Sequence, residues 1–192
     1  MGNPGKQYAK TRHNLGRRVV EELAWAHQAS WQLDRSFKAR WAEIHSNNLS
    51  FLAATPDSYM NLSGESVHRL VTHFKINFKS DLLVVADDAV LPFGQLRLRG
   101  EGSDGGHRGL GSIEASLASQ NYARLRIGIA PSTPSEKPLE EYVLEEFLPG
   151  EEKQIDPLLE RAAHACFLWL AQPLEKVMNE VNQPAPRPSS LP

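Results

Sequence analysis

The sequence predicts a single α/β domain in which helices flank a mixed, twisted sheet. Three observations support this prediction. The length of 192 residues is typical of one domain. Hydrophobic residues make up 41% of the chain, which is enough to form a core. Segments with the two-residue period of strands are interspersed with segments that have the period of helices.

The first third of the chain contains two helical patterns with a pair of strand patterns between them. In the first helix Val19, Val20 and Leu23 recur on one face, and the second has a similar apolar face that ends at Phe74. Asn47 and Asn48 favour a tight turn between the strands. The predicted elements are a helix over residues 17–28, strands over 41–45 and 49–54, and a helix that begins at Ser63 or Gly64.

The middle of the chain predicts two strands and a glycine-rich loop. Residues 82–86 form a continuous apolar run followed by two acidic residues, which is typical of a buried strand paired in parallel. Alternation over residues 95–99 predicts a second strand. Residues 100–111 contain six glycines, so we expect a loop there, followed by a helix that ends at Ala118.

The last third predicts one more strand and two helices. Residues 125–129 have strand composition, and residues 131–138 are a loop rich in proline and serine. Helical patterns cover residues 151–170 and 174–181. Residues 183–192 contain four prolines and two serines and should be disordered, so the domain is expected to cover residues 1–182.

Composition restricts the cellular compartment and the possible partners. Cys166 is the only cysteine, so no intrachain disulfide can form and a reducing compartment is expected. The start of the chain has no secretory pattern and no apolar run is long enough to span a membrane, so we expect a cytoplasmic protein without a membrane partner.

Charge is distributed unevenly along the chain. Residues 1–130 carry 16 basic and 12 acidic residues, a net charge of +4, whereas residues 131–192 carry 5 and 11, a net charge of −6. The net positive charge of residues 1–130 could bind phosphate on one face of the molecule. Ordinary scatter of surface charge is the alternative interpretation.

Four short segments contain candidate functional residues. A turn-forming Gly-Asn-Pro-Gly at residues 2–5 is followed by Thr11-Arg12-His13-Asn14, which places a histidine just before a helix. Asn61 precedes the next helix and could be its cap. Acidic residues follow a buried strand at 87–88, where open α/β sheets place ligands, although a turn aspartate is the simpler interpretation. The amides of the loop at 102–110 could face an anion.

Taken together, these segments resemble the bacterial peptidyl-tRNA hydrolase family. Four motifs occur in the family's order: GNPG…Y…TRHN, MNLSG, DD before LP.G, and GGH.GL. The similarity runs from Met1 to about Val181. The resemblance implies hydrolysis of the ester between a peptidyl or N-blocked aminoacyl group and the 3′ end of tRNA. It also implies recycling of tRNA, a monomer, and no cofactor or metal.

The resemblance also implies roles for individual residues. His13 matches the base that activates water, and Asp87 matches the carboxylate that orients it. Asn3 matches a residue that rejects unblocked aminoacyl-tRNA, and Asn61 matches one that binds the ester. The remaining matches concern tRNA: Tyr8 and Tyr59 for stacking, and Arg97 and Arg126 for clamping a phosphate.

Two departures from the family pattern stand out. Arg108 replaces an asparagine that contacts substrate in the family, so we expect Arg108 to contact tRNA and to make substrate binding more salt-dependent. The family also has a short apolar strand before the GNPG turn, which this sequence lacks. We therefore expect the natural chain to begin upstream of Met1.

Three other functional classes share features with this sequence. Residues 100–105 satisfy G-x-G-x-x-G, but no acidic residue for a ribose follows at the required distance, which disfavours a dinucleotide-binding oxidoreductase. The seven histidines are scattered, and His68 and His73 lack the spacing of a ligand pair, which disfavours a metal enzyme. A non-catalytic RNA-binding module remains the main alternative.

Overall fold

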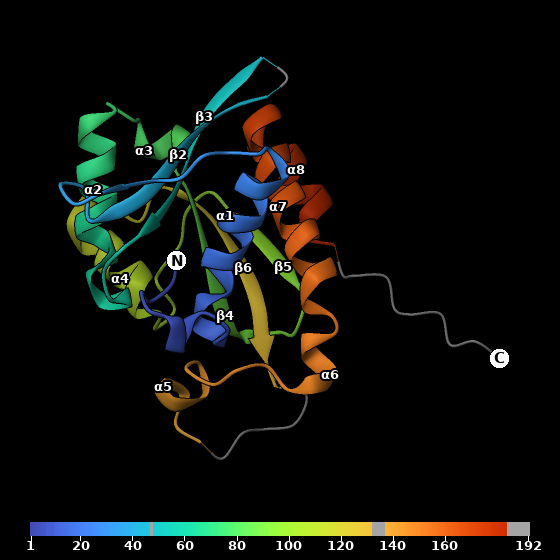
Figure 1. Ribbon diagram of the computed structural model, residues 1–192. Coiled ribbons are helices and arrows are strands. Elements are labelled where there is room, and N and C mark those ends of the chain that lie inside the picture. The colour runs from blue at the N-terminus through green and yellow to red at the C-terminus, as the bar shows by residue number, and fades with distance from the viewer. Residues whose placement is uncertain (47, 132–136, 184–192) are drawn as a thin grey trace.

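Two three-stranded sheets and the helices around them make up the part of the chain that the computed structural model describes, residues 1–46, 48–131 and 137–183 (Figure 1). The expected α/β domain is confirmed. The expected mixed sheet is confirmed as well, and the strands near the N-terminus form a second, antiparallel sheet that the sequence did not predict.

The first sheet is antiparallel and consists of β1 (Gln32–Asp34), β2 (Ala39–Ser46) and β3 (Leu49–Pro56). Its β2–β3 pair is the expected hairpin, and the ladder closes with Ser46 opposite Leu49. Residue 47, in the predicted turn, lies outside the described residues. β1 has only three residues, which is too short to show a period in the sequence.

The second sheet has the order β4-β6-β5, from β4 (Leu83–Pro92), β5 (Leu96–Arg99) and β6 (Ala123–Ala130). β4 and β6 are parallel, as the apolar run predicted, whereas β5 is antiparallel to β6. β4 extends six residues beyond the predicted end, because it is paired with β6 continuously through Asp88 and again at Pro92. The register then shifts where the Asp88 carboxylate accepts the amides of Val90 and Leu91 at 2.9 and 3.2 Å.

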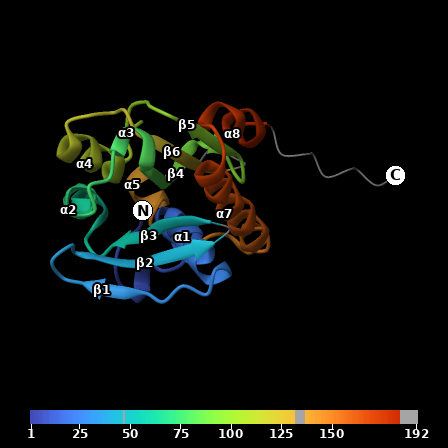
Figure 2. The same ribbon diagram turned by 90° about the horizontal axis from the view of Figure 1, so that it is seen from above.

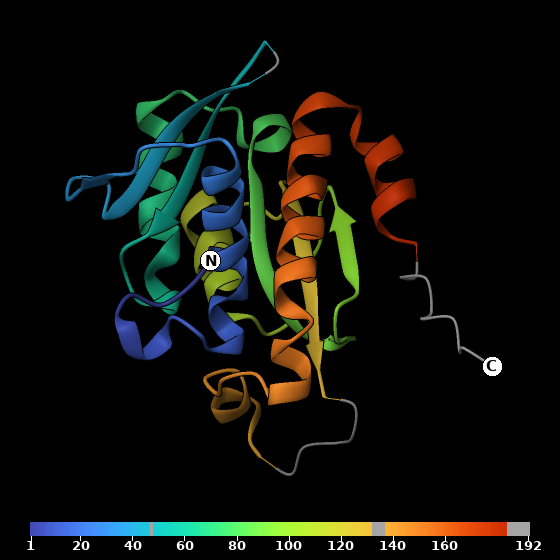
Figure 3. The ribbon, with the colours of Figure 1, turned by 45° about the vertical axis from the view of Figure 1, so that its right-hand side comes forward.

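Helices cover both faces of β4, which explains its continuous apolar run. On one face lie α1 (Leu15–Ala26), α7 (Ile155–Ala171) and α8 (Leu174–Val181), with Val85 in the shared core. On the other lie α2 (Ser63–His73) and α4 (Arg108–Leu117), with Val84 and Ala86 in a second core. Figure 3 shows α1 and α7 side by side in front of the strands, and Figure 2 shows the first sheet beside α1.

The predicted helix over residues 151–170 is two helices, α6 (Pro149–Glu152) and α7. Pro157 lies in the first turn of α7, where its missing N–H costs nothing. Its ring would clash with the carbonyl of residue 153 if the helix continued from α6, so the chain turns between them. The predicted helix at residues 174–181 is confirmed as α8.

Five short helical segments were not predicted because each is too short to show a period. Two of them directly precede longer helices: η2 (Arg12–Asn14) precedes α1, and η3 (Met60–Leu62) precedes α2. The others are η1 (Lys6–Tyr8), α3 (Phe78–Asp81) and α5 (Leu139–Tyr142).

The first residues are buried although they form no strand, as expected. The Met1 amine donates a hydrogen bond to the carbonyl oxygen of Val85 at 2.9 Å, and burial lowers the pKa of this amine to about 5. The Met1 side chain packs with Met60 and Leu110.

Two further expectations concern the tail and membranes. Apart from Gln183, the tail that was expected to be disordered lies outside the described residues, as does most of the proline- and serine-rich loop. Within the described ranges no helix combines the length and apolar character needed to cross a membrane.

Candidate active site

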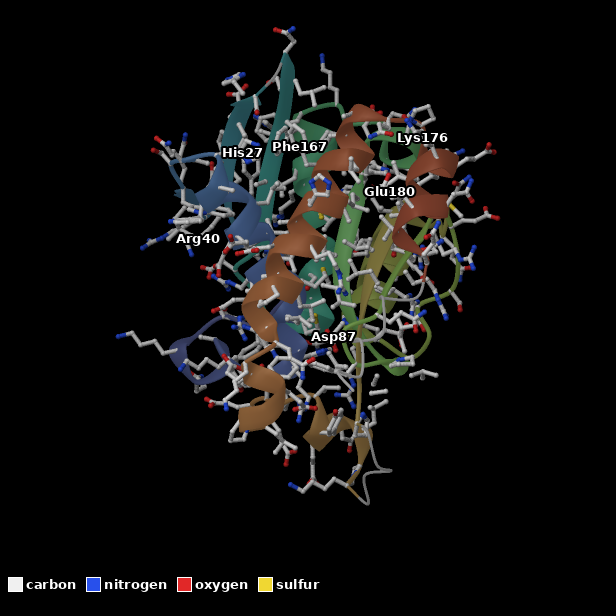
Figure 4. The ribbon with its side chains drawn as sticks, turned by 90° about the vertical axis from the view of Figure 1, so that its right-hand side faces the viewer. His27, Arg40, Asp87, Phe167, Lys176 and Glu180 are labelled. Atoms are coloured by element: carbon white, nitrogen blue, oxygen red, sulfur yellow. The ribbon has the colours of Figure 1, made fainter. Side chains whose placement is uncertain are left out.

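The centre of the site is a buried carboxylate held between two histidines. Asp87 of β4 is 2% exposed, and both of its oxygens lie 3.0 Å from Nδ1 of His13. His107, the N-cap residue of α4, places its Nε2 3.1 Å from Asp87 Oδ1. The two imidazole rings are 4.7 Å apart at their centroids. Figure 4 shows Asp87 well away from Lys176 and Glu180 of α8.

Close packing of α1 on β4 brings His13 to Asp87. His13 lies in η2, three residues before Gly16 in the first turn of α1. A Cβ at Gly16 would lie 2.3 Å from the Val85 carbonyl oxygen, which is far too close for any side chain. Glycine therefore allows the start of α1 to contact the backbone of β4 just before Asp87.

The hydrogen bonds of His107 determine its tautomer. Its Nδ1 accepts the amides of Gly109 and Leu110 at 3.1 and 3.2 Å, so this nitrogen carries a lone pair. The proton is therefore on Nε2, which donates to Asp87. Both ring nitrogens of His107 are thus occupied. His13 uses Nδ1 alone, and no described residue bonds its Nε2.

Opposing effects act on the pKa of Asp87. Burial alone would raise it, because a carboxylate loses its hydration in the interior. The attraction and hydrogen bonds of His107 and His13 outweigh burial and hold the pKa well below its ordinary value. Asp87 is therefore ionised at neutral pH and can keep a proton on Nδ1 of His13.

Asn3 is fixed by three hydrogen bonds, none of which uses its side-chain nitrogen Nδ2. Its Oδ1 accepts the Met60 amide at 2.8 Å. Asn14 binds the Asn3 backbone on both sides, since Asn14 Oδ1 accepts the Asn3 amide at 2.7 Å and Asn14 Nδ2 donates to the Asn3 carbonyl at 2.9 Å. The side-chain NH2 of Asn3 is the group that remains for a ligand.

One cavity of about 460 Å³ contains nearly all the residues that the sequence singled out. Its lining includes Asn3, Tyr8, His13, Tyr59, Asn61, Asp87, Arg108 and Arg126. Exposed apolar side chains also border it, namely Val90, Leu139 and Leu144. A volume of this size is typical of a small-molecule or chain-end binding site.

The two arginines expected to clamp phosphate differ in their surroundings. Arg126 lines the cavity but already donates to Asp88 at 3.2 Å and to the Ser103 carbonyl at 2.6 Å. Arg97 lies directly opposite Arg126 in the β5–β6 ladder and is exposed, outside the cavity lining. Within the described ranges Arg97 has no acidic partner. Arg126 also holds the glycine-rich loop through Ser103, and Gly105 and Gly106 of that loop line the cavity beside it.

Sequence reasoning missed two residues that build the site. His107 belongs to the glycine-rich loop in the sequence, and histidine is not among the residues preferred at a helix N-cap, so no local signal marks it. Asn14 follows His13 in the sequence, but no local pattern indicates its hydrogen bonds to the backbone of Asn3. The interpretation of the histidines as scattered is also wrong for His13 and His107, whose ligand atoms lie within 4.8 Å of one another and of Asp87. This His-Asp-His set has donors that zinc accepts, but its atoms already satisfy one another.

The chain is similar to known proteins over nearly its whole length. A family model described as Peptidyl-tRNA hydrolase matches residues 1–189. A peptidyl-tRNA hydrolase of Roseiflexus castenholzii is 46% identical over 188 residues, which cover 98% of this chain and 87% of that protein. One from Chloroflexus aurantiacus is 41% identical and covers 95% of this chain and 96% of its own length.

Solved structures show the same likeness. A peptidyl-tRNA hydrolase in complex with N-propanol superimposes with a TM-score of 0.87 at 30% identity, covering 95% of this chain and 91% of that one. The peptidyl-tRNA hydrolase of Acinetobacter baumannii gives a TM-score of 0.86 at 31% identity, covering 94% and 91%.

Proposed function

The chain belongs to the peptidyl-tRNA hydrolase family, a family of ester hydrolases, and we propose that it cleaves the ester between a peptidyl group and the 3′ end of tRNA. In this proposal His13 is the general base that activates water. One observation carries the assignment. Of the two imidazoles on Asp87, only that of His13 keeps a ring nitrogen without a partner among the described residues.

The reaction needs only water and these side chains. His13 Nε2 takes a proton from water, and the resulting hydroxide attacks the ester carbonyl carbon. Asp87 accepts a hydrogen bond from Nδ1–H of His13 and stabilises the imidazolium without taking its proton. When the tetrahedral intermediate collapses, the bond to the ribose oxygen breaks and the imidazolium returns its proton to that oxygen. The products are tRNA with a free hydroxyl and a peptide with a free carboxyl group.

Asn3 and Asn61 would hold the two sides of the ester. Asn3 Oδ1 is bound to the Met60 amide, so the amide nitrogen of Asn3 can donate to a carbonyl of the peptide. That donor would meet an unblocked ammonium unfavourably, which gives selectivity for blocked substrates. Asn61 is exposed at the cavity wall, where it can polarise the ester carbonyl or position the water.

The remaining residues would bind tRNA. Tyr8 and Tyr59 line the cavity and offer aromatic faces to an unpaired base. In this proposal Arg126 and Arg108, which line the cavity, and Arg97, which lies beside Arg126 in the sheet, would bind phosphates of the tRNA. We propose that the protein works in the cytoplasm, where it frees tRNA from incomplete translation products.

The test is release of free tRNA from an N-acetylated aminoacyl-tRNA by the purified protein. We expect the His13→Ala variant to lose about 10²- to 10⁴-fold in kcat. Circular dichroism should show that this variant is folded. If the unaltered protein binds tRNA but releases none, the RNA-binding alternative holds and the proposal fails.

A further inference from the structure

An ion pair joins two walls of the cavity at its mouth. Arg108 is the first residue of α4, and Glu140 belongs to α5. Arg108 Nη2 lies 3.3 Å from Glu140 Oε2, and both residues line the cavity. The pair therefore connects the segment that carries His107 with the segment that forms the opposite wall.

The pair is too exposed to hold the fold together. The side chains of Arg108 and Glu140 are 71% and 70% exposed, so water and salt screen their attraction. Such a pair opens readily and can exchange partners. Arg126, the other arginine in the lining, is only 14% exposed and is held by Asp88 and Ser103. Arg108 is therefore the lining cation that a ligand can recruit at the lowest cost.

The position of Arg108 relates it to a particular part of the substrate. Arg108 directly follows His107, which contacts the same carboxylate as His13. In the proposed reaction the ester carbonyl lies at His13, and the ester oxygen belongs to the terminal ribose. The nearest phosphodiester is attached to that same ribose, one sugar away from the ester. A guanidinium at the mouth matches this charge and can bind it with two hydrogen bonds.

We propose that Arg108 binds a phosphodiester of the tRNA 3′ end, and that Glu140 is an intramolecular competitor that occupies Arg108 until tRNA displaces it. The inference rests on the proposed function, because it takes tRNA to be the ligand. It assigns Glu140 a role in tuning the affinity for substrate, separate from the chemistry at His13.

The competitor role can be tested by binding alone. Deacylated tRNA is titrated into the unaltered protein and into Glu140→Gln, Arg108→Asn and the double variant, with fluorescence anisotropy as the readout over a range of salt concentrations. Glu141→Gln is the matched control, because Glu141 is exposed on the same helix and does not line the cavity. It removes the same charge without touching Arg108.

We expect Glu140→Gln to tighten tRNA binding about two- to fivefold at low salt, the range for an exposed ion pair. Arg108→Asn should weaken binding and reduce the slope of log Kd against log salt by about 0.7 to 0.9, as expected for one lost phosphate contact. In the Arg108→Asn background, Glu140→Gln should give no gain.

Two results would overturn the inference. An equal gain from Glu141→Gln would mean that only overall charge matters. A gain from Glu140→Gln that persists without Arg108 would mean that the two residues do not compete. Hydrolysis by the unaltered protein is measured separately. If the protein binds tRNA but does not hydrolyse the ester, the proposed function fails while the binding comparison still tests the competition between Glu140 and tRNA.

Discussion

His107 shows how hydrogen bonding divides roles between two chemically identical side chains. It caps α4 through Nδ1 and supports Asp87 through Nε2, so it is a positioning residue in our proposal. We predict that His107→Leu lowers kcat about tenfold and costs about 1 kcal/mol of stability through the lost cap. An asparagine at this position can accept the amide hydrogen bonds at the start of α4 and donate to Asp87. We therefore expect His107→Asn to keep most of the kcat and most of the stability.

The measurement pairs steady-state kinetics with urea unfolding of both variants. If His107 had only a structural role, His107→Leu would lose stability without a lower kcat. His107→Asn would then differ from His107→Leu in stability alone. A loss with His107→Asn as large as that with His13→Ala would instead place His107 in the proton transfer.

Asn3 offers a test of substrate selectivity at a single atom. Asn3→Asp keeps the acceptor for the Met60 amide but replaces the free NH2 donor by a charged oxygen. We predict that the ratio of kcat/KM for blocked over unblocked aminoacyl-tRNA falls about 10- to 100-fold, the value of one charged hydrogen bond. An unchanged ratio, measured with both substrates on the same tRNA, would remove Asn3 from this role.

At the scale of elements, the contact between α1 and β4 determines whether His13 reaches Asp87. We predict that Gly16→Ala lowers the free energy of unfolding by about 1–3 kcal/mol, because the added carbon overlaps the Val85 carbonyl. It should also lower kcat by moving η2 away from β4. Chemical denaturation and kinetics measure the two effects.

Gly150→Ala is the matched control for this substitution. A Cβ at Gly150 meets no atom within 4 Å, and the residue lies in α6. Stability and activity should be unchanged or slightly raised there. If Gly16→Ala behaves like Gly150→Ala, α1 can shift without cost and does not determine the geometry of the site.

A second link between elements supports the same region. Arg12 is buried beside His13, and its guanidinium lies 2.8 Å from Glu151 of α6 and over the rings of Tyr142 and Phe147. The backbone of His13 also donates to the Val143 carbonyl at 2.8 Å. The base and the cavity wall that carries Glu140 are therefore tied together through the η2 segment.

At the scale of the whole molecule, lowered carboxyl pKa values set the response to acid. The pKa of Asp87 is held below its ordinary value of 3.8 by the two histidines, although burial opposes this. The Ser36 hydroxyl lowers the pKa of Asp34, and Lys38 and Arg69 lower that of Glu65. The folded chain thus binds fewer protons than the unfolded chain in acid.

We predict that these carboxyls leave the free energy of unfolding nearly constant above pH 5 and lower it as the pH drops below about 4, by at most about 1.4 kcal/mol per pH unit for Asp87. The lowered pKa of the Met1 amine acts separately and lowers the free energy of unfolding as the pH falls from about 8 to about 5. Urea unfolding between pH 3 and 6 measures the effect of the carboxyls. Asp87→Asn should flatten the dependence of the free energy of unfolding on pH in this range. Glu141→Gln, at an exposed carboxyl, should leave that dependence unchanged. If Asp87→Asn shows the same pH dependence as the unaltered protein, the lowered pKa of Asp87 does not contribute to acid unfolding.

The sequence by itself determined the chemical parts and most of the elements. Periodicity located α1, α2 and α8, because each has an apolar face long enough to show its period, and a continuous apolar run located the parallel strand β4, because both of its faces are covered. The motifs identified the family and placed His13, Asp87, Asn3 and Asn61 in one site, which the cavity brings together.

Tertiary structure decided what depends on contacts between residues distant in the chain. It separated the first sheet from the second, which local periodicity cannot do because pairing partners are not encoded in a single strand. It brought His107 to Asp87, twenty residues away, and thereby fixed which histidine keeps a free nitrogen. It also placed Glu140 against Arg108 across the cavity mouth, since the field around a charge depends on distance in space and not along the sequence.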